Sequence, residues 1–160
     1  MGSQTAWALF QIGRKDEASA RIKEFLKDYP EDAGGAFAGV QAILLAAAGE
    51  ERSAEDKIES AEKKNAFGHF HHTAYWIACA YALMNKPRLA VQWLQEAAET
   101  GFPCYPLFGL DSNLDPLRND PRFITFMDTL KKRWEHYEAT LGIGSGSRES
   151  CRGKADGIDP

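Results

Sequence analysis

Three histidines and a cysteine are the side chains whose types and spacing come closest to a chemical site. His69, His71 and His72 lie together, and Cys79 follows seven residues after His72. Imidazole nitrogens and thiolates are ordinary zinc ligands, and this spacing places His72 and Cys79 on one helix face. The cluster lacks the paired spacings of known zinc sites, and no second cluster lies nearby in the sequence. A metal-dependent enzyme is therefore the remote alternative, and partly exposed loop histidines are the simpler interpretation.

No other catalytic signature accompanies the histidines. The sequence contains no Gly-rich phosphate loop, no nucleophile elbow and no nucleotide-binding fingerprint. The adjacent acids Glu50 and Glu51, and Glu55 and Asp56, fit a turn and a solvated helix face. We therefore expect a protein that is not an enzyme and that uses neither a cofactor nor a metal ion.

Charge and cysteine content narrow the classes of function further. The 19 basic and 23 acidic residues give a net charge of -4 without a basic cluster, unlike a nucleic-acid-binding surface. The odd set Cys79, Cys104 and Cys151 argues against a disulfide framework and indicates a reducing compartment. The longest nearly apolar run, residues 36–48, is too short to cross a bilayer. We expect a cytoplasmic protein with neither nucleic acid nor a membrane as its partner.

Alanines recur along the chain at a step of 36 residues. A fixed period of this length indicates one small structural unit that is copied and stacked. Apolar residues at three- and four-residue spacings predict two helices in each copy. Small side chains let two antiparallel helices approach to about 8–10 Å, so we expect one alanine pair at each hairpin contact. The pairs are Ala6 with Ala18, Ala42 with Ala54, and Ala78 with Ala90.

The pattern predicts one domain, residues 1–142, followed by a tail. Three helical pairs occupy about 1–32, 33–68 and 69–102, and a cap occupies 103–142. Asp120 and Pro121 predict the start of a long amphipathic helix that closes the stack, and a short helix precedes it near 114–118. Residues 143–160 are expected to be a flexible tail or a sequence added by cloning. The helices expected in the pairs end at Ile12 and span 15–28, 33–48, 52–65, 73–84 and 87–100.

This pattern resembles the tetratricopeptide repeat, a helix–turn–helix unit of usually 34 residues. The period of 36 residues, the missing opening tryptophan and a Leu or Ile in place of a later aromatic depart from the family pattern. Residues 114–123, LDPLRNDPRF, also resemble the ending of repeat regions in bacterial signalling proteins. The residues that match the repeat signature are Ala18, Ile22, Pro30, Ala78, Tyr81, Ala90 and Leu94.

The resemblance implies a right-handed α-α superhelix whose first helices line a concave, peptide-binding groove. Carried over to this chain, the groove is apolar and aromatic. Tryptophan and tyrosine are typical anchors of protein interfaces, although such side chains also fit an ordinary core. The residues expected in the groove are Trp7, Phe10, Gln11, Gly39, Ile43, Ala47, His72, Tyr75, Trp76 and Cys79.

We therefore expect a scaffold or adaptor module that binds a protein or peptide partner in this groove. An exposed apolar face of this kind marks either a binding site or an oligomer interface. The alternative is self-association, in which a second copy of the chain fills the groove and forms a homodimer.

Overall fold

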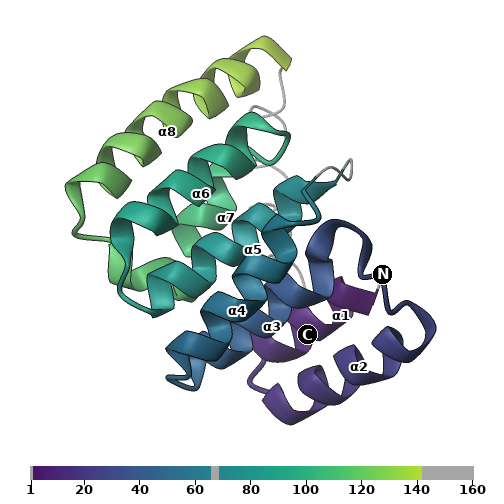
Figure 1. Cartoon of the computed structure of the whole chain (residues 1–160). Coiled ribbons are helices and arrows are strands. Elements are labelled where there is room, and N and C mark those ends of the chain that lie inside the picture. Colours follow the sequence, from purple (N-terminus) through teal and green to yellow (C-terminus); the bar gives the residue numbers. More distant parts are fainter. Residues whose placement is uncertain (1, 66–68, 142–160) are drawn as a thin grey trace, which may run out of the picture.

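The computed structural model describes residues 2–65 and 69–141 and shows a helical molecule (Figure 1). No strand occurs in these ranges, so the predicted all-α class is confirmed. None of the described helices is both long and apolar enough to cross a membrane. The expected tail, residues 143–160, lies outside the described residues.

Residues 2–65 and 69–99 contain consecutive helical hairpins. They are α1 (Gly2–Gln11) with α2 (Lys15–Asp28), α3 (Ala36–Ala47) with α4 (Glu51–Glu62), and α5 (Phe70–Leu83) with α6 (Pro87–Glu99). Neighbouring hairpins are joined through their first helices, because α3 packs against both α1 and α5 (Figure 1). The alanines expected at the hairpin contacts are fully buried, each with 0% exposure: Ala6, Ala18, Ala42, Ala54, Ala78 and Ala90.

Each hairpin turns at a residue in the left-handed conformation. Gly13, Gly49 and Asn85 have φ angles of 81°, 79° and 56°. Glycine adopts this conformation freely, and asparagine tolerates it better than most other residues. The three residues lie in the gaps between the helices expected in each pair, at 13–14, 49–51 and 85–86.

The helix expected over 33–48 begins later, at Ala36. Before it lies the short 3-10 turn η1 (Ala33–Gly35), in which Gly34 and Gly35 have left-handed φ angles of 73° and 64° that an α-helix does not contain. Asp32 then caps α3, because its Oδ1 and Oδ2 accept hydrogen bonds from the amides of Phe37 and Ala38 at 2.8 and 3.0 Å. The two glycines thus keep residues 33–35 out of the helix that was expected over 33–48.

The C-terminal part of the described chain contains α7 (Tyr105–Leu110), η2 (Ser112–Leu117) and α8 (Pro121–Leu141). The short helix expected near 114–118 is η2, a 3-10 helix, and α8 matches the predicted long helix. Helix α7 was not expected. Its Pro106 sits in the first helical turn, where a missing N–H costs nothing. η2 packs against α5, and α8 packs against α6 and α7.

The apolar stripe of α8 is only partly covered. Phe123, Phe126 and Leu130 are buried, whereas Tyr137 and Leu141 are 52% and 65% exposed. The cap expected from the whole stripe is therefore formed by the first half of the helix. Figure 1 shows α8 running alongside α6 at one end of the molecule.

Candidate functional site

The α5 part of the face expected to form a peptide groove is covered by residues 102–117 of the same chain. Tyr75, Trp76 and Cys79 of α5 are only 2%, 3% and 0% exposed. Phe108 of α7 stacks on the ring of Tyr75, with centroids 5.3 Å apart and an interplanar angle of 12°. Phe102 lies 5.4 Å from the same ring. Contrary to the expectation of an open groove, these α5 side chains are inaccessible to a partner in this conformation.

The other residues expected in that groove lie at different depths. Phe10, Gly39 and Ile43 are buried. A side chain at Gly39 would meet Thr73 Cγ2 at 3.3 Å, so the glycine allows the close approach of α3 to α5. Trp7, Ala47 and His72 are half-buried, and Gln11 is exposed.

A buried carboxylate ties the covering segment to this face. Asp111 is 5% exposed, and its Oδ2 accepts a hydrogen bond from the Tyr75 hydroxyl. Its Oδ1 accepts from the Asn113 amide at 2.9 Å and from Gln11 Nε2 at 3.3 Å. Asn113 Nδ2 donates back to Gln11 Oε1 at 3.0 Å. Asp111 therefore joins η2 to both α1 and α5, a role that the sequence did not indicate.

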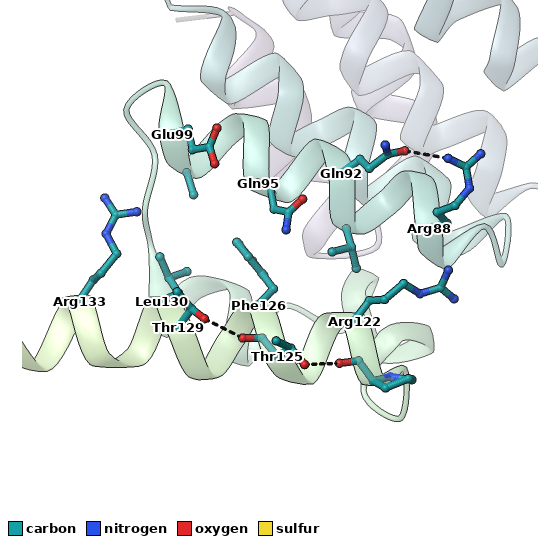
Figure 2. Close-up of a pocket in the computed structure, with 13 residues that line it drawn as sticks. Arg88, Gln92, Gln95, Glu99, Arg122, Thr125, Phe126, Thr129, Leu130 and Arg133 are labelled. Carbon is teal, nitrogen blue, oxygen red and sulfur yellow. Dashed lines mark hydrogen bonds between the residues drawn. The ribbon is translucent and has the colours of Figure 1, made fainter.

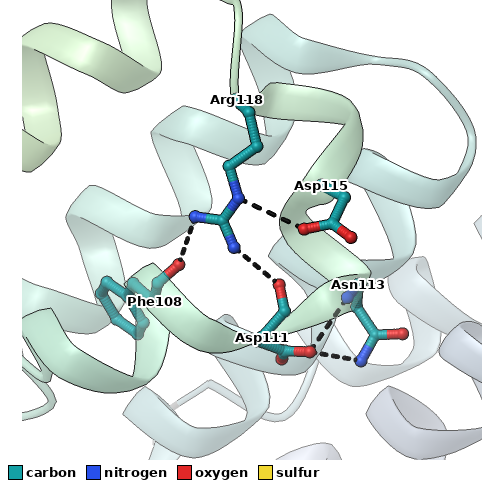
Figure 3. Close-up of polar contacts among 5 residues, drawn as sticks. All are labelled: Phe108, Asp111, Asn113, Asp115 and Arg118. Atoms are coloured by element: carbon teal, nitrogen blue, oxygen red, sulfur yellow. Dashed lines mark hydrogen bonds and ion pairs between the residues drawn. The ribbon is translucent and has the colours of Figure 1, made fainter.

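Arg118 holds the covering segment from its other side (Figure 3). Its Nη1 and Nη2 donate to the carbonyl oxygens of Phe108 and Asp111, each at 2.9 Å, and its Nε donates to Asp115 Oδ1 at 3.3 Å. The guanidinium carbon lies 5.5 Å from the centroid of the Phe123 ring. The Arg118 side chain thus contacts α7, the residue between α7 and η2, η2 itself and the start of α8.

The buried thiol and phenol on this face are poor candidates for catalysis. Burial raises the pKa of the Cys79 thiol well above its usual value, and the Asp111 carboxylate raises it further. Burial also raises the pKa of Tyr75, with added effects of Cys79 and Asp111. Since a nucleophilic cysteine acts as its thiolate, Cys79 is held in the unreactive form.

The histidines form a ring cluster beside the covering segment. The His71 and His72 centroids are 4.4 Å apart, and His72 lies 5.0 Å from Phe102. Burial lowers the pKa of His72, and neighbouring His71 lowers it further. The Cys79 thiol contacts the Asp111 carboxylate at 3.7 Å. In the described ranges, no group of three or more His, Cys, Asp or Glu side chains is arranged to hold a metal ion.

An open groove lies between α6 and α8 (Figure 2). It has a volume of about 580 Å³. Its floor is apolar and includes Val91 and Ala98 of α6 and Phe126 and Leu130 of α8. Figure 2 shows the two helices running in the same direction, with their side chains facing each other across the gap. The polar and rim residues are Arg88, Gln92, Gln95, Glu99, Pro121, Arg122, Thr125, Thr129 and Arg133.

The rims of this groove carry more positive than negative charge. Arg122 pairs with Asp120 at 2.7 Å, whereas Arg88 bonds only a neutral glutamine of its own helix. Neither Arg88 nor Arg133 makes an ion pair with any residue in the described part of the chain. Glu99 is the acidic residue among those that line the groove. A second hollow, of about 340 Å³, shares Arg88 and Arg122 with the groove.

The groove was missed in the sequence because its rim residues looked like ordinary solvated helix positions. On α6 the lining positions recur at steps of three and four from Arg88 to Glu99. The same spacing runs from Arg122 to Arg133 on α8. Each pattern alone predicts an exposed face, and only the packing of α8 beside α6 brings the two together.

Two surfaces therefore differ: the α5 face around Tyr75 and Cys79 is covered by residues 102–117, and an open groove lies between α6 and α8. The groove is therefore the accessible feature on which a binding function can be argued. Comparison of the chain with protein-family models, with curated proteins and with solved structures finds no match.

Proposed function

We propose that this chain is a tetratricopeptide-like helical module that binds a protein partner, as a scaffold or adaptor, and catalyses no reaction. The observation that carries the proposal is the groove between α6 and α8, which has an apolar floor between two polar rims. An apolar centre within a polar rim is the usual anatomy of a protein interface. Stacked helical hairpins commonly present extended binding surfaces of this kind.

The shape of the groove favours a length of polypeptide over a compact metabolite. Its volume falls within the range of small-molecule pockets, so volume alone does not decide between them. The two walls run from Arg88 to Glu99 and from Pro121 to Arg133, about 17 Å at 1.5 Å per helical residue. A groove of this length suits several consecutive residues of a partner chain.

The covered concave face supports the proposal in a second way. Asp111 and Arg118 tie α7 and η2 to α5 and α8, and so hold α8 beside α6. A binding surface that exists before the partner arrives loses less conformational entropy on binding. We therefore assign the covering segment a supporting role and place binding at the α6–α8 groove.

A peptide-display selection tests this function. A random peptide library would be selected against the native chain and then screened against two tryptophan variants. Gln95→Trp fills the groove from its rim, and Glu96→Trp is the matched control, since it adds the same bulk at a neighbouring exposed position outside the groove. We expect selected peptides to lose binding to Gln95→Trp and to retain it on Glu96→Trp. Peptides that bind both variants equally, or no enrichment at all, would contradict the assignment.

A further inference from the structure

We propose that the partner segment in the α6–α8 groove is an acidic amphipathic helix of another protein. This inference rests on the proposed function and names the chemistry of the partner. It draws on the length of the groove, the narrowness of its apolar floor and the sign of its charge.

The apolar floor of the groove is narrow and lies between two polar rims. Val91 and Ala98 of α6 and Phe126 and Leu130 of α8 line the seam, and because each is 9% exposed or less, only their outer edges are accessible to a partner. Both rims beside them are built of polar side chains that are exposed to solvent. A helix with a single apolar stripe and polar flanks matches the cross-section of the groove, as in other complexes in which an amphipathic helix lies in a groove.

The length of the groove matches about three helical turns. The walls cover 12 and 13 residues of their own helices, from Arg88 to Glu99 and from Pro121 to Arg133. A helix laid along the seam would therefore contact it over a similar number of residues. The adjoining hollow at Leu89 extends the surface beyond the end of the groove marked by Arg88 and Arg122.

Charge selects an acidic partner. Arg88 and Arg122 stand at one end of the groove and Arg133 at the other (Figure 2). Arg88 and Arg133 have no carboxylate partner among the described residues, although the chain as a whole carries a net charge of -4. A positive groove on a negative protein attracts acidic partners selectively and disfavours basic ones. Acidic residues near both ends of the bound helix would meet these arginines.

Three labelled peptides of 14 residues test the inference directly. They share one leucine stripe and helical length and carry Glu, Gln or Lys at the flanking positions. Titration with the full chain, followed by fluorescence anisotropy, is expected to show about tenfold tighter binding of the Glu peptide than of the Gln peptide, and the weakest binding of the Lys peptide. Raising NaCl from 50 to 500 mM should remove most of the Glu preference, because salt screens exposed charges.

Arg133 and Lys132 form a matched pair for the same titration. Both are exposed cations on α8, but only Arg133 lines the groove. Arg133→Gln should weaken the Glu peptide about threefold and leave the Gln peptide unchanged. Lys132→Gln removes the same charge outside the groove and should change neither.

The outcomes distinguish failure of the acidic-helix inference from failure of the proposed binding function. Equal binding of the Glu and Gln peptides, lost in Gln95→Trp, would overturn the acidic preference and leave the binding function standing. No binding of any of the three peptides would overturn the helical partner, and failure of the display selection would overturn the binding function itself. A chain that sediments as a dimer, and as a monomer once Gln95→Trp fills the groove, would replace the foreign helix with a second copy.

Discussion

At the scale of single residues, the buried carboxylate of Asp111 is the clearest polar determinant of the fold. It accepts hydrogen bonds from Tyr75, Asn113 and Gln11, which come from three different elements. A buried charge of this kind is stabilising only while all its donors are in place. We therefore expect the packing of residues 102–117 on α5 to depend on Asp111.

Replacing Asp111 with Asn should lower the free energy of unfolding by about 2 kcal/mol, because hydrogen bonds to a charged acceptor are lost and buried donors are left unpaired. Urea denaturation measures the change. Asp115→Asn is the control, since Asp115 is exposed and should cost about 0.5 kcal/mol or less. Tyr75→Phe, made in the native chain and in Asp111→Asn, would give the coupling energy between Tyr75 and Asp111. Equal stability of Asp111→Asn and the native chain would contradict the role given to this carboxylate.

His72 should make the stability of the chain fall in acid. Burial and neighbouring His71 lower its pKa in the folded state below the ordinary 6.5. As the pH falls below 6.5, the unfolded chain therefore takes up the proton before the folded chain does, and the free energy of unfolding decreases. Above that pH both states are neutral at this position and the contribution is constant.

Urea denaturation at pH 7.5, 6.5 and 5.5 tests this pH dependence. We expect the drop between pH 6.5 and 5.5 to be smaller in His72→Gln than in the native chain. His136→Gln serves as the control, because His136 is exposed on α8 and away from the ring cluster. An identical pH dependence of His72→Gln and the native chain would show that other groups cause the drop.

At the scale of elements, the hairpin contacts depend on a few positions that accept no larger side chain. Gly35 is the sharpest case. It has a φ of 64°, and a side chain there would stand 2.6 Å from Ala61 Cα in α4. The entry to α3 and the end of α4 therefore share one close contact.

Gly35→Ala should lower the free energy of unfolding by about 3 kcal/mol, through left-handed strain combined with the clash against α4. Gly13→Ala is the matched control. Its φ of 81° imposes similar strain, but no atom lies within 4 Å of the added side chain. We expect Gly13→Ala to cost about 1 kcal/mol in the same thermal or urea measurement. Equal costs at the two glycines would show that the contact with α4 is unimportant.

Prediction from sequence succeeded for helices with a strong periodicity of apolar residues. It failed at segments where proline and glycine residues gave no clear indication of a helix or its start. Helix α2 and the start of α6 were predicted at their observed residues, because alanine spacing, turn glycines and Pro87 mark them. Helix α7 was missed, since Pro103, Pro106 and Gly109 suggest a loop. The 3-10 turn before α3 was missed because the expected helix was extended back through Gly34 and Gly35 to residue 33.

At the scale of the whole molecule, the packing of the C-terminal segments on the hairpins decides which surface stays accessible to a partner. The concave face was expected to be open, but residues 102–117 return to it and bury Tyr75 and Cys79. Sequence spacing within one helix cannot reveal such a return, because the contact joins positions 36 residues apart. The groove between α6 and α8 was unpredictable for the same reason.

Site-specific photocrosslinking in the source cell tests the central claim most directly. A benzophenone amino acid would replace Thr129, which lines the groove, or Leu110, which is 83% exposed on the covering segment. We expect a protein adduct from position 129 that disappears when Gln95→Trp fills the groove, and none from position 110. An adduct from position 110 alone would place the partner on the covered face and contradict binding at the α6–α8 groove.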